Sequence, residues 1–275
     1  MARNVRERVQ LAALMAPVAI LFAAFFLLPL AQLVVIGGSG KLGWSAYLAV
    51  FTETRYLKSF GATIALSAGV TFFTLIVSGV TGVFLERNRF RGRAFLTALL
   101  TLPLAFPGVV IGSMVIMLAG RQGLVPDFTD FFFGERLVFA YSMAGLFMGY
   151  VYFSIPRTIL TVMAAAEKLD PRLEEAARSL GAGPFMVVRD VILPALKPAF
   201  LAAGAICFAT SMGAFGTAFT LATRINVVPM VIYTEFTLQA NVAMAAALSF
   251  VLGGITWAAL AFARSLSGSS VAASG

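Results

Sequence analysis

Six long apolar runs separated by short polar segments constrain this chain more than any other feature. Each run is 20 residues or longer, enough for an α-helix to cross a bilayer. A soluble domain cannot bury this much apolar surface, because 60% of the residues are hydrophobic and only 12% are charged. We therefore expect an all-α integral membrane protein, a single transmembrane domain over residues 1–275, with six helices at residues 11–36, 61–85, 94–118, 137–156 or 137–166, 199–223 and 242–263.

The basic residues are distributed unevenly between the loops. Fourteen of the twenty lie before the first run, after the second, after the fourth or after the sixth. Short loops rich in Lys and Arg stay on the cytoplasmic side of a membrane, so both termini are expected in the cytoplasm. The first run is too long for the core of a cleavable signal peptide, and we interpret it as a retained signal-anchor. The +8 net charge is spread over these loops, so orientation explains it better than a nucleic-acid partner.

The longest polar interruption, residues 167–198, begins with the signals of a short helix. Asp170 followed by Pro171 predicts an N-cap and a first helical residue. One face of the helix is apolar and the acidic Glu174 and Glu175 fall outside it; the apolar positions are Leu173, Ala176, Ala177 and Leu180. Gly181 is expected to end the helix, because glycine accepts the left-handed conformation common at helix ends.

A second helix is expected directly after that turn. Pro184 suits its first position, and Pro194 with Pro198 predicts its end or a kink before the fifth apolar run. The product is a cytoplasmic helix-turn-helix between the fourth and fifth transmembrane helices. Its alanines allow a close backbone approach, so the hairpin is suited to docking into a groove on a partner.

The hairpin resembles the EAA loop of bacterial binding-protein-dependent ABC importer permeases. The matching positions, at the family's spacing, are Glu175, Ala176, Ala177, Gly181, Val191, Leu193 and Pro194, with Glu174 directly before them. The family usually has isoleucine where this chain has Val191. The resemblance implies a permease of the bacterial inner membrane whose loop seats on a cytoplasmic ABC ATPase dimer. It also implies a second, related permease chain, an extracytoplasmic binding protein, and ATP and Mg²⁺ bound by the ATPase, with no cofactor in this chain.

Energy for transport is expected to come from outside this chain. With Arg157 taken as a boundary residue, the six runs contain no Asp, Glu, Lys, Arg or His, whereas ion-coupled carriers usually place ionisable groups at membrane depth. The chain also lacks the GxxxxGK[ST] pattern of an ATPase. With no histidine and Cys207 as its one cysteine, neither an enzyme nor a metal site is expected. The alternative is a secondary carrier or channel that works without ATP.

The candidates for the translocation path are Arg157, Ser211, Thr217 and Thr220. An arginine at the end of a membrane helix is also explained by snorkelling to the interface, and small residues in the fifth run also permit close helix packing. The solute is expected to be small and hydrophilic. Size and layout are most similar to polyamine permeases, followed by those for phosphonates, for the oxyanions sulfate and molybdate, and for ferric iron.

Overall fold

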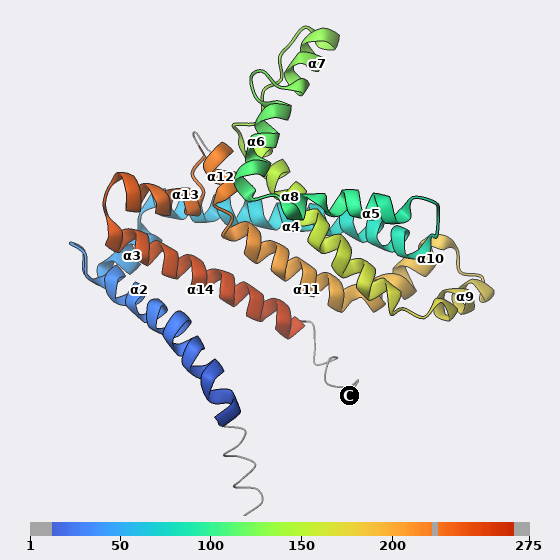
Figure 1. The fold of residues 1–275 in the computed structure, drawn as a ribbon, viewed down its shortest axis with the longest axis horizontal. Coiled ribbons are helices and arrows are strands. Elements are labelled where there is room, and N and C mark those ends of the chain that lie inside the picture. The colour runs from blue at the N-terminus through green and yellow to red at the C-terminus, as the bar shows by residue number, and fades with distance from the viewer. Residues whose placement is uncertain (1–12, 222–224, 267–275) are drawn as a thin grey trace, which may run out of the picture. The chain divides into compact units, whose positions relative to one another are not determined.

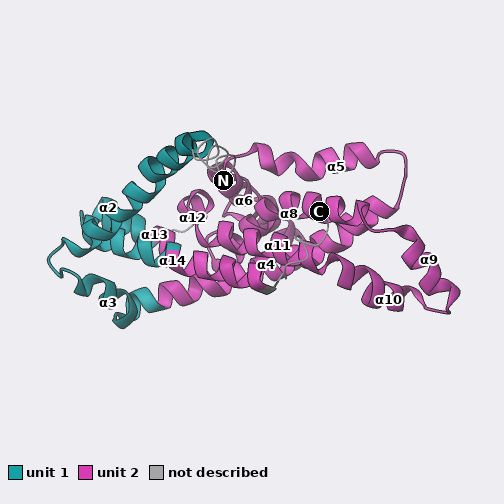
Figure 2. Ribbon diagram, turned by 90° about the horizontal axis from the view of Figure 1, so that it is seen from below, with its two compact units in different colours: residues 1–57, 231–253 teal, residues 58–230, 254–275 magenta. Residues whose placement is uncertain are grey.

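The computed structural model describes residues 13–221 and 225–266, and all regular secondary structure in these ranges is helical (Figure 1). Within them, six helices are long and apolar enough to cross a membrane, which confirms the predicted fold class. They are Ala13–Gly38, Thr54–Arg87, Gly108–Phe133, Met143–Glu167, Pro184–Met212 and Val242–Ser265. The chain forms two compact units, Met1–Leu57 with Val231–Gly253 and Lys58–Met230 with Gly254–Gly275 (Figure 2).

The first unit is built around close approaches at glycine. Its elements are η1 (Ala23–Leu27), α2 (Leu28–Gly38), α3 (Ser45–Thr52), η4 (Thr234–Leu238) and the first parts of α4 (Thr54–Arg87) and α14 (Val242–Leu266). A Cβ on Gly37 would lie 2.4 Å from the Tyr47 hydroxyl and 3.2 Å from the backbone nitrogen of Ala247. The Tyr47 hydroxyl donates to the carbonyl of Val34 at 2.8 Å, so α2 and α3 are held together where no side chain separates them.

A buried carboxylate joins two distant segments of the first unit. Glu235, in η4, is 1% exposed. It forms an ion pair with Arg55 at 3.1 Å and accepts hydrogen bonds from the Tyr56 hydroxyl at 3.2 Å and the Asn241 amide at 3.3 Å. A buried carboxylate is tolerated when it is paired and hydrogen-bonded in this way, and here it fastens the start of α4 to the turn before α14.

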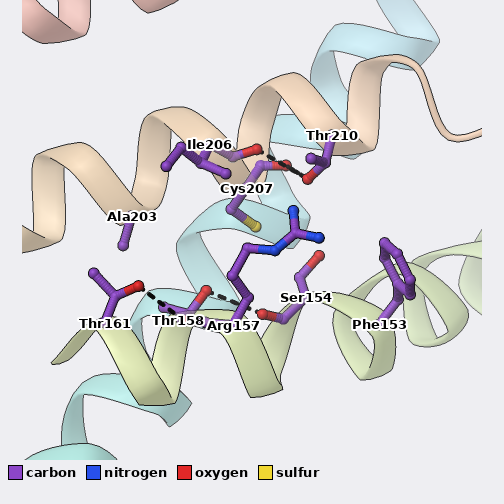
Figure 3. A pocket seen from close by; sticks show the side chains of 9 residues that line it. All are labelled: Phe153, Ser154, Arg157, Thr158, Thr161, Ala203, Ile206, Cys207 and Thr210. Carbon is purple, nitrogen blue, oxygen red and sulfur yellow. Dashed lines mark hydrogen bonds between the residues drawn. The ribbon is translucent and has the colours of Figure 1, made fainter. Parts of the chain in front are cut away.

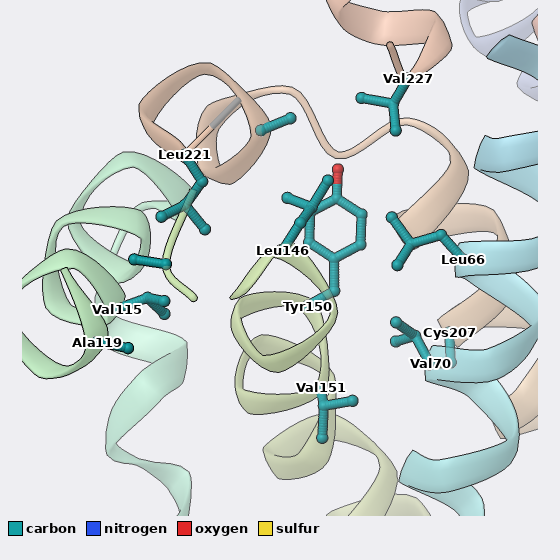
Figure 4. Packing of buried hydrophobic residues seen from close by; sticks show 12 residues of the cluster. Leu66, Val70, Val115, Ala119, Leu146, Tyr150, Val151, Cys207, Leu221 and Val227 are labelled. Carbon is teal, nitrogen blue, oxygen red and sulfur yellow. The ribbon is translucent and has the colours of Figure 1, made fainter. Parts of the chain in front are cut away.

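The second unit is a helical bundle around an apolar core. Its elements include the rest of α4, α5 (Arg93–Thr101), η2 (Leu102–Ala105), α6 (Gly108–Ala119), α7 (Leu124–Phe133), α8 (Met143–Glu167), α9 (Pro171–Ser179), α10 (Pro184–Val187), η3 (Val188–Ile192), α11 (Leu193–Met212), α12 (Gly216–Leu221) and the first half of α13 (Val228–Tyr233). Helix α8 contributes Leu146, Tyr150 and Val151 to the core (Figure 4). Both α6 and α11 pack against α8, and α12 packs against α6.

Two elements differ from the predicted spans because of proline. The run at 94–118 is not one kinked helix: α5 gives way to a 3₁₀ turn at Leu102–Ala105, and Phe106 is extended before Pro107. A residue before proline avoids the helical region, so α6 begins only at Gly108, and the apolar span there is Gly108–Phe133. The predicted loop after it accordingly contains a helix, α7.

At the second place, prolines that were expected to end a helix lie within it. Pro194 and Pro198 do not end the helix, and α10, η3 and α11 form one helical span from Pro184 to Met212. The π-helical turn at Val188–Ile192 directly precedes the prolines, and the backbone N–H of Leu193 donates five residues back to Val188. Such a turn inserts a local irregularity into the hydrogen-bond ladder, which lets the chain continue through both prolines.

Gly112 is expected to be intolerant of a large side chain. A Cβ at this position would lie 2.7 Å from the Thr220 Cβ, so Gly112→Leu must push α12 away from α6, at an expected cost of about 1–3 kcal/mol. Thermal unfolding of the purified protein in detergent measures this loss. Gly253→Leu is the matched control, because no atom lies within 4 Å of a Cβ there; equal stability of the two variants would contradict the prediction.

Candidate functional site

The first part of the helix-turn-helix, residues 167–184, has the predicted local structure. Helix α9 begins at Pro171, and the Asp170 carboxylate accepts the backbone N–H of Arg172 at 3.0 Å. Gly181 has φ +86°, the left-handed conformation expected of the turn. The second helix begins at Pro184. Local signals therefore identify all of these boundaries.

The hairpin leaves large apolar side chains exposed. On α9, Leu173 is 52% and Leu180 is 89% exposed, and Phe185 on α10 is 77% exposed. Leu173 and Leu180 belong to the apolar face predicted from the sequence, and in the described chain they are not covered. A surface of this kind on a polar hairpin is typical of a site that another protein covers.

Glu174 is the residue of the hairpin that the chain buries. Its carboxylate lies 2.7 Å from Arg87, at the end of α4, and 3.7 Å from Arg178 one turn further along α9. Arg87 also donates to the carbonyl of Leu169, just past the end of α8, at 3.2 Å. One guanidinium therefore connects the ends of two long helices to the hairpin.

The remaining positions of the EAA-like pattern lie on both sides of the hairpin. Glu175, Ala176, Gly181, Leu193 and Pro194 are exposed, and Ala177 and Val191 are half-buried. Ala177 packs against an apolar cluster between α8 and the second helix, formed by Val162, Ala166, Val187, Ile192 and Leu196. The hairpin is thus fixed to the bundle along one side and open on the other.

A pocket lies between α8 and α11, and Arg157 extends into it (Figure 3). The pocket is lined from α8 by Phe153, Ser154, Arg157, Thr158 and Thr161, and from α11 by Ala203, Ile206, Cys207 and Thr210. Helix α8 continues to Glu167, so Arg157 lies inside the span and not at its boundary. This agrees with the longer of the two expected fourth spans, 137–166, which contains Arg157.

The other three path candidates have different surroundings. Ser211 is buried on α11, and its hydroxyl has no hydrogen-bond partner in the described chain. Thr217 donates to the carbonyl of Gly108 at 3.0 Å, and Thr220 donates to the carbonyls of Gly216 at 3.0 Å and Val109 at 3.3 Å. Those two threonines attach α12 to α6, and none of the three lines the pocket around Arg157.

Two groups of residues were missed by sequence reasoning. Arg87 was interpreted only as part of a basic loop, because nothing near it in the sequence indicates a partner in the hairpin. Ser154 lies three residues before Arg157 and Thr161 four residues after it, about one helical turn each way, so their place on its face of α8 was available from helical spacing. The contribution of α11 to the pocket could not be predicted from the sequence, because it depends on how α8 and α11 pack together.

The sequence of this chain is similar to those of known proteins. Residues 78–268 match the family described as "Binding-protein-dependent transport system inner membrane component". The sulfate transport system permease protein CysT of Escherichia coli (strain K12) is 35% identical over 208 residues, which cover 72% of this chain and 70% of that protein. The molybdenum transport system permease protein ModB of the same strain is 32% identical over 179 residues, 62% of this chain and 77% of that one.

Two further matches extend over more of the chain. The putative 2-aminoethylphosphonate transport system permease protein PhnU of Salmonella typhimurium (strain LT2) is 26% identical over 239 residues, 84% of each chain. A crystal structure of a bacterial alginate ABC transporter, in complex with a periplasmic protein that carries an alginate pentasaccharide, superposes with a TM-score of 0.83. It is 17% identical and covers 97% of this chain and 96% of that chain, which shows a shared fold.

Proposed function

This chain belongs to the inner membrane components of binding-protein-dependent transport systems, and we propose that it is the permease subunit that a separate ATPase drives through the hairpin at residues 167–198. The observation that supports this role best is the exposed side of that hairpin. Leu173, Leu180 and Phe185 remain uncovered there, next to the exposed Glu175 of the EAA-like pattern. A partner protein that covers this surface would gain apolar burial and a charged contact together.

The proposed mechanism transmits motion through the hairpin into the bundle. When the ATPase dimer closes on ATP and Mg²⁺, it pushes on α9. The hairpin is joined to α4 and α8 through Glu174 and Arg87 and is continuous with α11. A packed bundle responds to such a push by changing between discrete arrangements, and the solute path is thereby exposed to each side in turn.

The complete transporter needs partners that supply what this chain lacks. The sequence has no ATPase phosphate-binding loop, so ATP is bound by the partner. We propose that a second, related permease chain completes the path, that an extracytoplasmic binding protein delivers the solute, and that both termini lie in the cytoplasm of a bacterial cell. The basic loops support that orientation.

We propose an oxyanion or phosphonate as the imported solute. The three relatives are named for sulfate, molybdenum and 2-aminoethylphosphonate, which supports the oxyanion and phosphonate alternatives above the polyamine alternative that the layout favours. Arg157 adds a physical reason, because a fixed positive charge inside a span repels a polycation and attracts an anion. Ferric iron remains an alternative outcome of a transport assay.

Two glycines in the hairpin give a test with a matched control. A Cβ on Gly181 or Gly183 meets no atom within 4 Å, but only Gly181 has a positive φ, +86°; Gly183 has φ −70°. Gly181→Val is therefore expected to strain the turn by about 1–2 kcal/mol and to reduce ATP-driven uptake at least about tenfold, while Gly183→Val changes uptake little. Glu175→Arg is expected to weaken assembly with the ATPase. Normal uptake and normal ATPase assembly in Gly181→Val and Glu175→Arg would show that the hairpin does not couple.

The competing function is an ATP-independent carrier or channel. Proteoliposomes that contain the complete transporter distinguish the two, because an ABC importer accumulates solute only when ATP and Mg²⁺ reach its ATPase. Accumulation in the absence of nucleotide would refute the proposed function, whatever the effect of the hairpin variants.

A further inference from the structure

Arg157 lies deep within a helix that is long and apolar enough to cross a membrane. Helix α8 extends from Met143 to Glu167, so ten residues separate Arg157 from its C-terminal end. At 1.5 Å per residue this is roughly 15 Å along the helix. An arginine inside a membrane-spanning helix is rare and almost always faces a cavity or the interior of a bundle.

No carboxylate of the described residues forms an ion pair with this arginine. Arg157 takes part in none of the ion pairs found in residues 13–221 and 225–266, and the contact recorded for its guanidinium is with the ring of Phe153, 6.0 Å from the ring centroid. The structural arginines of this chain behave differently: Arg87 and Arg55 each pair with a buried carboxylate. A charge without a partner at this depth is typical of a site that receives a charge from a ligand.

The hydroxyl groups of the pocket differ in whether they are free to donate a hydrogen bond to a ligand. Three of them already donate to carbonyls of their own helices: Thr158 to Ser154 at 3.0 Å, Thr161 to Arg157 at 2.9 Å, and Thr210 to Ile206 and Cys207 at 2.9 and 3.0 Å. Ser154 makes no such hydrogen bond within the described residues. The donors left for a ligand are therefore the guanidinium of Arg157 and the hydroxyl of Ser154, both on α8 (Figure 3).

This set of groups suits one class of ligand. The lining contains no Asp or Glu, so no carboxylate in it offsets the charge of a cation. A guanidinium presents a planar fork of N–H groups that matches two oxygens of a tetrahedral anion, whereas a lysine ammonium acts as a point charge. The pocket therefore favours an anion with several equivalent oxygens over a cation or a neutral solute.

We propose that the Arg157 pocket is a transit site for a tetrahedral oxyanion or a phosphonate group, which Arg157 holds through two parallel N–H···O bonds and Ser154 through a third. This assignment rests on the proposed function as a permease and adds the position and chemistry of a solute contact to it. One wall of the site is formed by α8 and α11. A single guanidinium binds the anion weakly enough for release, as transport through a path requires.

Uptake kinetics of the complete transporter test the site first. The probes are sulfate, molybdate and 2-aminoethylphosphonate, each delivered by the cognate binding protein to proteoliposomes that contain ATP. For Arg157→Gln we expect kcat of uptake to fall roughly 10- to 100-fold, as for loss of a charged hydrogen-bonding partner, with an unchanged KM for the loaded binding protein. Arg157→Lys keeps the charge without the fork, and we expect an intermediate loss. Arg121→Gln, which removes an exposed arginine outside the pocket, is the control.

A second measurement does not depend on uptake. Thr210→Cys in a Cys207→Ala background places one thiol at the pocket, and its reaction with a sulfonate-bearing methanethiosulfonate is compared with that of a trimethylammonium-bearing one. The thiol is expected to react faster with the anionic reagent than with the cationic one. Arg157→Gln is expected to reduce this preference at least about tenfold. The probe anion is expected to slow the reaction by occupying the pocket. A cysteine at the exposed Leu124 is the control, where Arg157→Gln should leave the preference unchanged.

The outcomes separate this proposal from the proposed function. If Arg157→Gln and Arg157→Lys transport all three anions at the normal rate, or if the charge preference at position 210 does not depend on Arg157, the transit site is wrong while hairpin-driven import still stands. If Arg157→Gln fails to assemble, Arg157→Lys decides the matter: normal kcat overturns the bidentate contact, and reduced kcat with normal KM supports it. Uptake without ATP would instead refute the proposed function.

Discussion

Glu174→Ala is expected to uncouple ATP hydrolysis from uptake. The Glu174 side chain is 11% exposed and lies 2.7 Å from Arg87, and removing one partner of such a pair leaves a poorly solvated charge behind. The expected cost is about 3 kcal/mol, at the low end for buried pairs, because the Arg87 side chain is 21% exposed. That energy is lost at the contact between the hairpin and the bundle, so ATP turnover is expected to continue while solute imported per ATP falls at least about tenfold.

The control for Glu174 is an ion pair of similar geometry that does not reach the hairpin. Glu86 and Arg93 lie 2.6 Å apart and are similarly shielded, so Glu86→Ala should lower stability and leave the ratio of solute to ATP unchanged. The charge exchange Arg87→Glu with Glu174→Arg should restore coupling in part, because it re-forms an ion pair between α4 and α9. The recovery is expected to be incomplete, because the new arginine lies near Arg178 and the hydrogen bond from Arg87 to Leu169 is lost. Normal coupling in Glu174→Ala would show that this pair has only a structural role.

Glu235→Ala is expected to produce the largest loss of stability among single substitutions in the first unit. The substitution removes the carboxylate shared by Arg55, Tyr56 and Asn241, at an expected cost of about 3 kcal/mol, the low end for buried pairs, because the Arg55 side chain is 47% exposed. Glu235→Gln keeps an acceptor oxygen and should cost less. Thermal unfolding in detergent gives the order of the variants, and the exposed Glu53→Ala is the control. Equal unfolding temperatures for Glu235→Ala and Glu53→Ala would contradict this account.

The boundaries of the hairpin were predictable and its attachment to the bundle was not. Asp170, Gly181 and Pro184 act through the backbone of their immediate neighbours, so a short stretch of sequence contains the necessary information. Glu174 was assigned to the polar side of α9, where a solvent-exposed position is the usual expectation. Its burial depends on Arg87, which another helix places there, and no local pattern reports such a contact.

The prolines show how one residue type leads to opposite results. Pro107 follows an extended residue and a 3₁₀ turn and separates α5 from α6, whereas Pro194 and Pro198 lie inside a continuous helix. Each proline lacks a backbone donor. Pro156 also lies inside a helix, α8, so a proline alone does not decide whether a helix ends, and the π-helical turn before Pro194 has no sequence signature of its own.

Arg157 illustrates a limit of hydropathy. Arg157 lies between an apolar run and a segment of small residues, and mean hydropathy over a sequence window falls there, which suggests the end of a transmembrane helix. Helix α8 nevertheless continues ten residues further, to Glu167. The alternative span of 137–166 predicted the C-terminal end of this helix within one residue. Which side of α8 the arginine occupies, and that α11 lies opposite it, follow from packing in three dimensions.

The helical span from Pro184 to Met212 connects the hairpin to the pocket. Pro184 and Thr210 are 26 residues apart along it, about 39 Å at 1.5 Å per residue. A tilt of about 5° about its hairpin end would sweep Thr210 sideways by roughly 3 Å over that length, as far as a hydrogen bond is long. Small rotations imposed at one end would therefore suffice to widen or close the gap opposite Arg157.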